Sequence, residues 1–138
     1  MAESQNIRPR RSFLFVPGTG PEMFPKALSA APDIVCIDLE DAVIPEDKVD
    51  ARRATLKLFE DVPGDTGPEL LVRVNSLRSR DGIDDIAAIL AAPSPPPGLM
   101  LPKVKTPDEV VLLADMLDSE DSDIRLQVII ETNEGLEA

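Results

Sequence analysis

Five short apolar runs, separated by segments with helical spacing, constrain the fold of this 138-residue chain more than any other feature. The runs are Ser12–Val16, Ile34–Leu39, Leu70–Val74, Leu99–Val104 and Leu126–Glu131. Most are nearly continuous rather than alternating, which is typical of strands buried on both faces of a parallel sheet. We therefore expect five parallel strands.

Four segments between these runs have the spacing of amphipathic helices, namely Pro21–Ala31, Glu46–Glu60, Asp81–Ala92 and Thr106–Leu117. The last is the clearest, because Thr106 can cap the helix, Pro107 suits its first turn and Glu109 completes a capping box. Strands that alternate with helices imply right-handed crossovers and a parallel sheet. The predicted fold class is α/β, in a single domain over residues 1–138 without an internal boundary.

Two residue types limit the chemistry that is possible. The chain has no His and only one Cys, Cys36. Ser-His-Asp and Cys-His catalysis, His-ligated zinc, an internal disulfide and a thiolate cluster are therefore excluded. A metal would need oxygen ligands, which favours Mg²⁺, Ca²⁺ or Mn²⁺. We expect Cys36 to be an inert core residue.

The charge balance excludes further classes of partner. With 14 Lys and Arg against 26 Asp and Glu, the net charge is −12, which opposes binding to nucleic acid or to an anionic membrane. No apolar run approaches the roughly 18 residues of a membrane-spanning helix. The first residues, Met1–Arg11, lack the apolar stretch of a secretory signal. We therefore expect a cytoplasmic protein.

Polar residues follow the carboxyl ends of the apolar runs, where parallel α/β proteins bind ligands. In chain order these ends read Pro17-Gly18-Thr19-Gly20, Asp38-Leu39-Glu40-Asp41, Arg73-Val74-Asn75, Pro102-Lys103-Val104 and Glu131-Thr132-Asn133. Charged groups at four of the five ends predict a polar pocket of acids, one Arg and one Lys. The first end matches neither a GxGxxG nor a Walker loop, so it does not indicate a nucleotide.

Several of these residues also have a structural interpretation. Arg73 lies among buried apolar residues and needs a partner, which is either a salt bridge or a ligand. Asp38 could be a solvated strand end, and Asp41 could anchor the next segment. Lys48 and Arg52, at i and i+4 of a helix, either face solvent or form ion pairs around the site.

The same strand ends resemble the HpcH/HpaI aldolase and citrate lyase β-subunit superfamily, near its malyl-CoA and citramalyl-CoA lyase branch. The matching blocks are Arg11–Gly18, Asp33–Val43, Lys48 with Ala51-Arg52, Arg73–Asn75, Met100–Val104 and Ile129–Leu136. They occur in the family's order and cover nearly the whole chain. Together, DLEDAV, RVN and MLPKV are specific, whereas any one alone is weak.

This resemblance implies a Mg²⁺-dependent lyase, with Mn²⁺ as a possible substitute, that acts on a carbon–carbon bond of a 3-hydroxyacyl thioester. The partners would be an acyl-CoA or acyl-carrier thioester and a small keto acid, and the assembly a homo-oligomer, a trimer or hexamer. By the same resemblance Arg73, Glu40 and Asp41 are catalytic and Glu131 is a metal ligand. Arg73 also binds substrate, together with Pro17, Gly18 and Lys103.

The resemblance further implies a (β/α)8 TIM barrel, which typically takes about 250 residues. We expect this chain to supply about the first five strands and four helices, as an incomplete barrel, with a second acidic metal ligand outside it. Adjacent strands in numerical order, with helices on one side, would fit a barrel. Two alternatives are a non-catalytic half-barrel acting by subunit association and a flavodoxin-like receiver with strand order 2-1-3-4-5.

Overall fold

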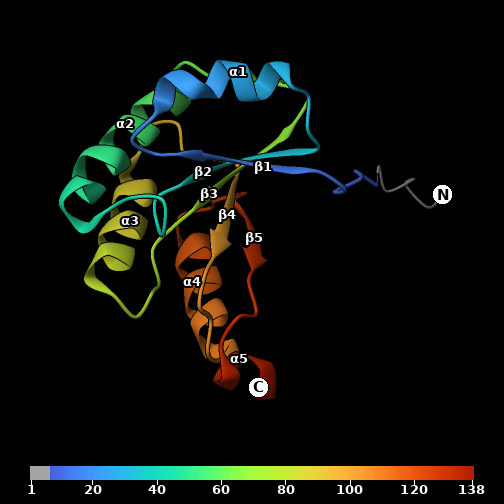
Figure 1. Cartoon of the computed structure of the whole chain (residues 1–138). Helices are drawn as coiled ribbons and strands as arrows, with labels where there is room; N and C mark the ends of the chain where they lie inside the picture. Colours follow the sequence, from blue (N-terminus) through green and yellow to red (C-terminus); the bar gives the residue numbers. More distant parts are fainter. Residues whose placement is uncertain (1–6) are drawn as a thin grey trace.

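The computed structural model describes residues 7–138, and its centre is one parallel five-stranded sheet (Figure 1). The strands are β1 (Phe13–Pro17), β2 (Ile34–Asp38), β3 (Glu69–Arg73), β4 (Gly98–Leu101) and β5 (Arg125–Val128). They are hydrogen-bonded in the order β1-β2-β3-β4-β5, with every pair parallel. The predicted numerical order is confirmed, and the receiver alternative is wrong because it requires a different order.

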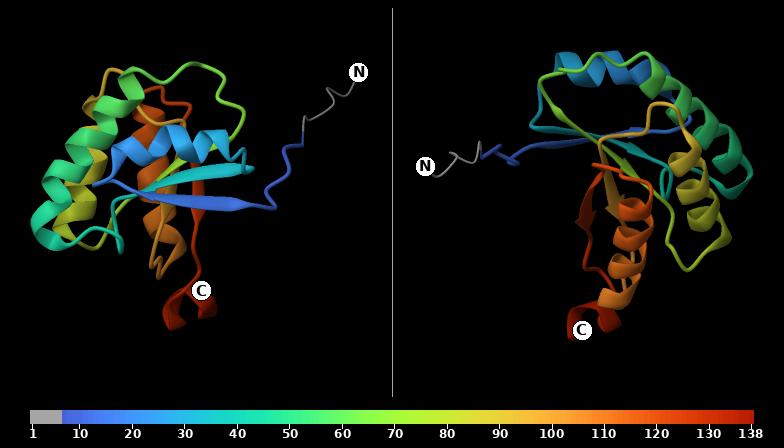
Figure 2. Two further views of the ribbon diagram at one scale, coloured as in Figure 1. Left: turned by 45° about the horizontal axis from the view of Figure 1, so that its top comes forward. Right: turned by 180° about the vertical axis from the view of Figure 1, so that it is seen from behind.

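All four predicted helices are present, and they cover one side of the sheet (Figure 2). They are α1 (Phe24–Ser29), α2 (Lys48–Glu60), α3 (Arg80–Ala91) and α4 (Pro107–Ser119), with short 3-10 turns η1 (Pro21–Met23) and η2 (Pro45–Asp47). The short helix α5 (Asn133–Glu137) was not predicted. Its start is fixed by Thr132, whose Oγ1 accepts a hydrogen bond from the Gly135 N–H at 2.9 Å.

The main core lies between the sheet and these helices. Strand side chains such as Val35, Ile37 and Val72 pack there against Phe59 of α2 and Ile89 of α3. Burial of these apolar surfaces is the main stabilising contribution to the fold. This packing fixes the strands relative to one another and therefore also positions their carboxyl ends.

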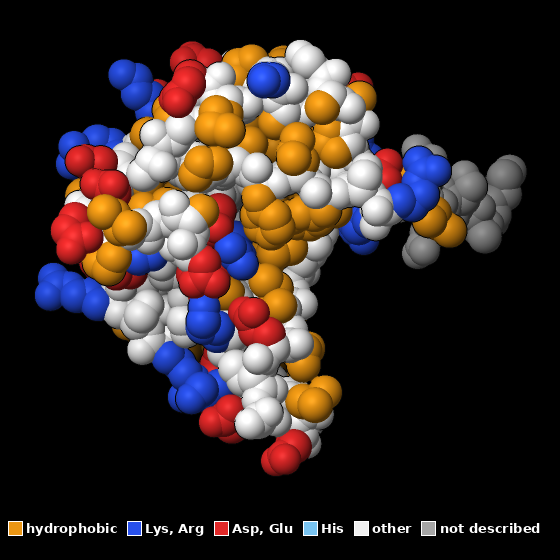
Figure 3. All heavy atoms as spheres, viewed as in Figure 1, with side chains coloured by type: hydrophobic (Ala, Val, Ile, Leu, Met, Phe, Trp, Pro, Cys, Tyr) orange, Lys and Arg blue, Asp and Glu red, His pale blue; other side chains and the backbone are white. Residues whose placement is uncertain are grey.

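The opposite, concave face of the sheet carries a second, smaller apolar cluster of Ile34, Cys36, Leu71 and Met100. Beside it, Phe13 and Phe15 of β1 remain 38% and 44% exposed. Figure 3 shows this face as a hydrophobic patch bordered by acidic and basic side chains. The curvature and the one-sided helices are those of part of a barrel wall.

Cys36 lies in this inner cluster with no exposed surface, as predicted. Burial raises the pKa of its thiol to about 12, and the neighbouring Asp38 charge adds to the shift. The thiol is therefore un-ionised at neutral pH, in keeping with an inert core residue.

The capping box predicted for α4 is wrong. Thr106 does precede the helix, but its side chain makes no capping hydrogen bond. Glu109 instead accepts hydrogen bonds from the Lys105 backbone N–H and from Arg78 Nε. The charged partner from the loop before α3 holds the carboxylate away from Thr106.

Two expectations concern targeting segments. Within residues 7–138 no helix is long and apolar enough to cross a bilayer. Residues 1–6, part of the segment that lacks the pattern of a secretory signal, lie outside the described residues.

Candidate active site at the carboxyl edge of the sheet

The carboxyl edge of the sheet brings together charged side chains from the ends of β2, β3, β4 and β5. Asp38 and Arg73 are the last residues of β2 and β3, and they are direct neighbours in the strand register. Glu40 and Lys103 follow β2 and β4, and Glu131 follows β5. The charged residues predicted from the ends of these four strands therefore converge, and Gly18 of the loop after β1 packs against the same edge.

Asp38 is the centre of the most buried part of this cluster, at 2% exposure. Its carboxylate accepts hydrogen bonds from Arg73 Nε at 2.9 Å and Arg73 Nη2 at 2.6 Å. It also accepts the backbone N–H groups of Glu40 at 2.9 Å and Ala42 at 3.1 Å. Burial by itself raises the pKa of Asp38, but the Arg73 and backbone hydrogen bonds outweigh it and hold this pKa below its usual value. Asp38 is thus not a solvated strand end.

Arg73 has the salt-bridge partner that its sequence context required, yet Asp38 does not occupy all of its guanidinium. Asp38 takes the Nε and Nη2 side, and Nη1 lies 3.4 Å from Glu40 Oε1. The guanidinium carbon also stands 4.9 Å from the centre of the Phe15 ring, a cation–π contact. The guanidinium is held in place from two sides and presents Nη1 toward the site.

Glu40 is 6% exposed, and its two carboxylate oxygens differ in their surroundings. Oε2 pairs with Lys103 Nζ, whereas the buried Oε1 has no hydrogen-bond partner. Burial raises the pKa of Glu40, and the Lys103 ammonium only partly opposes this effect. A buried carboxylate oxygen without a hydrogen bond is costly and therefore indicates a site for a ligand.

Lys103 connects the acids of the site. Its φ angle of +51° is a left-handed conformation that is unusual for a residue with a side chain. In this conformation its backbone N–H donates to Glu131 Oε1 at 2.9 Å, while Nζ contacts Glu40 and lies 3.3 Å from Asp41 Oδ1. The side chain predicted to bind substrate thus lies against the acidic pair, and Asp41 remains 69% exposed.

The donor chemistry of this edge is compatible with a hard cation, since Glu40, Asp41 and Glu131 offer only oxygen atoms. The observation that favours an added positive group is that Glu40 Oε1 accepts no hydrogen bond, although Arg73 Nη1 lies 3.4 Å away. In the described part of the chain, however, no three His, Cys, Asp or Glu side chains are close enough to form a metal site on their own. Mg²⁺ often takes only one or two protein carboxylates and keeps several waters, so the residues present suit part of its coordination shell.

The loop after β1 packs against this edge through Gly18. The Gly18 N–H donates to the Asp38 carbonyl at 2.8 Å, and Gly18 is buried. A Cβ at this position would lie 2.7 Å from Leu39 Cδ2 and 3.1 Å from the Asp38 carbonyl oxygen. A side chain here would crowd the segment that carries Glu40 and would force Leu39 to shift, so glycine suits this close packing.

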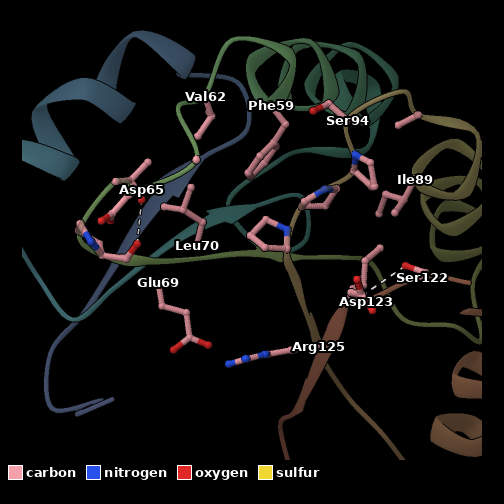
Figure 4. A pocket seen from close by; sticks show the side chains of 18 of the residues that line it. Phe59, Val62, Asp65, Glu69, Leu70, Ile89, Ser94, Ser122, Asp123 and Arg125 are labelled. Atoms are coloured by element: carbon pink, nitrogen blue, oxygen red, sulfur yellow. Dashed lines mark hydrogen bonds between the residues drawn. The ribbon is translucent and has the colours of Figure 1, made fainter. Parts of the chain in front are cut away.

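A hollow of about 1260 Å³ lies elsewhere in the described chain. It is at the amino ends of the strands, between Leu70 of β3, Arg125 of β5 and the last turns of α2 and α3 (Figure 4). Glu69 and Arg125 point toward one another at its edge (Figure 4). None of the predicted site residues lines this hollow, so it is not the candidate site.

A curved parallel sheet with helices outside and a charged cluster at its carboxyl edge is the arrangement of TIM-barrel enzymes. Within that class, residues 11–138 match the family described as HpcH/HpaI aldolase/citrate lyase, and the chain belongs to this family.

Among curated relatives, the chain is 40% identical over 108 residues to the mitochondrial citramalyl-CoA lyase of Homo sapiens, covering 78% of this chain and 31% of that protein. It is 35% identical to the (3S)-malyl-CoA thioesterase of Cereibacter sphaeroides over 134 residues, which is 96% of this chain and 44% of that one. The chain thus spans less than half the length of both relatives.

Solved structures agree in fold. RipC from Yersinia pestis superposes with a TM-score of 0.74 at 34% identity, over 95% of this chain and 51% of that chain. The citrate lyase β subunit of M. tuberculosis, complexed with oxaloacetate and magnesium, gives a TM-score of 0.67 at 34% identity, over 91% and 51% of the two chains. The interpretation of this chain as about half of a TIM-barrel-type protein is confirmed.

Proposed function

We propose that the protein carrying this chain is a Mg²⁺-dependent lyase that cleaves a carbon–carbon bond of a 3-hydroxyacyl thioester, such as malyl-CoA or citramalyl-CoA. The observation that supports this most is that Arg73 Nη1 lies 3.4 Å from the buried Oε1 of Glu40, an oxygen that accepts no hydrogen bond. The fixed guanidinium of Arg73 and the buried carboxylate of Glu40 are then available to one substrate. An acid–base reaction of an anionic substrate requires such a pair of groups.

The reaction breaks the bond between C2 and C3 of the thioester. The C3 hydroxyl loses its proton and becomes the carbonyl of a keto acid, while the bonding electron pair moves to C2 as a thioester enolate that is then protonated. Glu40 Oε1 is the candidate acceptor for the hydroxyl proton, because it accepts no hydrogen bond and because burial raises the pKa of Glu40. Arg73 Nη1 binds the substrate's carboxylate or carbonyl oxygens.

The remaining site residues hold Glu40 in position next to Arg73 or would bind the metal and the substrate. Lys103 holds Glu40 through Nζ and Glu131 through its backbone N–H. Glu131 would hold Mg²⁺, with Glu40 or Asp41 acting through bound water. When bound, the cation would stabilise negative charge on the reacting oxygens. Pro17 and Gly18 would form the wall of the substrate site next to Asp38.

Solved relatives support the substrate class. One M. tuberculosis protein, 32% identical, has a structure in complex with magnesium, acetoacetate and coenzyme A, and another structure holds magnesium and pyruvate. A carboxylate-bearing small molecule, a thioester carrier and Mg²⁺ are the groups that the charged edge of this sheet would have to accommodate.

A direct assay tests the proposal. The native protein is incubated with malyl-CoA or citramalyl-CoA and Mg²⁺, and glyoxylate or pyruvate is measured together with acetyl-CoA. We expect equal amounts of keto acid and acetyl-CoA. Absence of keto acid with both thioesters would contradict the proposal.

Thioester hydrolysis is the second candidate function, favoured by the similarity to a (3S)-malyl-CoA thioesterase over 96% of this chain. The same assay separates the two, because hydrolysis releases malate and free CoA without a keto acid. Thiol release from malyl-CoA without glyoxylate would establish hydrolysis in place of cleavage.

The cofactor can be tested separately by titrating Mn²⁺ and following its electron paramagnetic resonance signal. Glu131→Gln should weaken binding, because it removes the charge of the ligand. Glu137→Gln, an exposed acid in α5, is the matched control and should not change it. Equal Mn²⁺ affinity of the two variants would contradict the assignment of Glu131.

We also propose a trimeric or hexameric homo-oligomer, which analytical ultracentrifugation of the native protein would test. The cytoplasm stays our predicted compartment, although the human relative is named a mitochondrial protein. Imaging of a tagged protein in its own cells would decide between these compartments.

A further inference from the structure

A buried polar network behind the candidate site involves none of the groups assigned to the reaction. Asp85 of α3 has no exposed surface and Arg52 of α2 is 9% exposed. Arg52 Nε donates to Asp85 Oδ1 at 2.7 Å, which joins the two helices. Such a buried pair is costly to desolvate, and its benefit to stability alone is small.

The network continues from the helices to the end of β3 through Asn75, which is 5% exposed. Asp85 Oδ2 accepts both the Asn75 backbone N–H and its side-chain Nδ2, each at 2.8 Å. This orients the amide so that Nδ2 also donates to the Leu39 carbonyl at 3.0 Å and Oδ1 faces Lys48. Asp85 therefore sets which way the Asn75 amide points.

Lys48, at the start of α2, completes the chain of contacts. Its Nζ donates to Asn75 Oδ1 at 2.6 Å and to the carbonyl oxygens of Leu39 at 3.1 Å and Glu40 at 3.0 Å. The three protons of the ammonium are matched by three acceptors, none of them a carboxylate. The segment after β2 is a turn, in which the Val43 N–H also donates to the Glu40 carbonyl at 3.1 Å, and Lys48 supplies further hydrogen bonds to its carbonyl groups.

Glu40 is consequently held at both ends of its backbone. Its N–H donates to Asp38 at 2.9 Å and its carbonyl accepts from Lys48 at 3.0 Å. With its main chain fixed on both sides, the carboxylate is directed toward Arg73 and Lys103. Catalytic groups lose much of their effect when misplaced by as little as 1 Å.

We propose that Lys48, Asn75, Asp85 and Arg52 form a positioning network whose role is to hold Glu40 in its catalytic orientation. These four residues do not touch the reacting atoms and are therefore positioning residues. The inference rests on the proposed lyase function for its kinetic readout, but the geometry it describes can be measured without that activity.

The kinetic experiment uses the native protein and Lys48→Met, with Lys57→Met on the exposed side of the same helix as the control. We expect kcat for thioester cleavage to fall about 10- to 100-fold in Lys48→Met, with KM changed less than about twofold. Lys57→Met should match the wild type in both constants. A Lys48→Met variant with unchanged kcat and only a lower melting temperature would overturn the proposal.

A second pair of variants tests whether the network acts as a unit. Asp85→Asn keeps the shape of the side chain but removes its charge, and the neighbouring, half-exposed Asp84→Asn is its control. We expect the effects of Asp85→Asn and Lys48→Met on kcat to be strongly non-additive in the double variant, because both act through Asn75. Strictly additive effects would contradict a shared network.

Hydrogen exchange provides the readout that does not depend on activity. The amides of Glu40 and Ala42 should exchange at least about tenfold faster in Lys48→Met, while those of β3 stay at the wild-type rate. If the wild type cleaves no 3-hydroxyacyl thioester, the proposed function fails, and this result still decides whether the network holds Glu40. Unchanged exchange at Glu40 and Ala42 would overturn the inference.

Discussion

Breaking the ion pair between Asp38 and Arg73 by removing one partner should strongly destabilise the fold, because it leaves the other charge buried without its partner. In Asp38→Asn the single carbonyl oxygen cannot accept the four hydrogen bonds that the carboxylate accepts, two from Arg73 and one each from the Glu40 and Ala42 N–H groups. The new NH2 group would face donors. Removing one partner of a buried charge pair costs about 3–5 kcal/mol, and we expect a loss of that size in the free energy of unfolding at pH 7.

The pH dependence gives a sharper test than the loss alone. The pKa of Asp38 is lower in the folded than in the unfolded state, so its contribution is fully present above the unfolded pKa of about 3.9. It is lost as the pH falls through the folded pKa, because the carboxylate must then be protonated. The difference between wild type and Asp38→Asn should therefore be constant from pH 7 to about pH 5 and shrink below about pH 4.

Urea unfolding followed by circular dichroism measures both effects. Asp123→Asn is the control, since Asp123 is exposed and its side chain makes no hydrogen bond within residues 7–138, and its effect should stay within about 0.5 kcal/mol. A loss of less than about 1 kcal/mol for Asp38→Asn at pH 7 would refute the reasoning. So would a loss that stays the same at pH 3, because it could not come from an ionised Asp38.

Three further outcomes follow from the same contacts. Gly82→Ala in α3 would place a Cβ 1.9 Å from the Ser76 carbonyl oxygen and should lower the melting temperature strongly. Gly64→Ala is the control and should not, because a Cβ at Gly64 would meet no atom within 4 Å. Equal melting temperatures of the two variants would contradict this expectation. Cys36 should react with a disulfide reagent at pH 8 only as fast as the protein unfolds, because its pKa is raised to about 12, and rapid labelling of the folded protein would contradict this. Arg73→Lys should reduce kcat/KM by about 100-fold and also lower stability, since Lys cannot form the paired contacts with Asp38; full activity would contradict the role of the guanidinium.

The arrangement of the strands could be predicted from the sequence because it depends on short-range patterns. Continuous apolar runs alternating with amphipathic segments leave few topologies for a parallel sheet. The convergence of Glu40, Arg73, Lys103 and Glu131 then follows, since the carboxyl ends of parallel strands lie at one edge. The need of Arg73 for a partner was also visible in its apolar surroundings.

The partners themselves could not be predicted in the same way. Asp38 was not identified as the partner of Arg73, although the two are register neighbours, because the register depends on where each strand begins. The left-handed backbone of Lys103 could not be predicted either, because the residue is not a glycine and its contacts with Glu131 and the acidic pair join different strand ends. The link from Asp85 to Lys48 through Asn75 depends on how α2 and α3 rotate over the sheet.

The most direct test of the central claim, that this carboxyl edge is a lyase site, is the rate of keto-acid release from malyl-CoA or citramalyl-CoA at saturating Mg²⁺. Wild type, Glu40→Gln and Glu137→Gln should be compared in the native protein, with folding checked by circular dichroism. We expect Glu40→Gln to lose at least about 100-fold in kcat, because Gln cannot accept the hydroxyl proton, and Glu137→Gln to match the wild type. Equal keto-acid release by Glu40→Gln and the wild type would contradict the account.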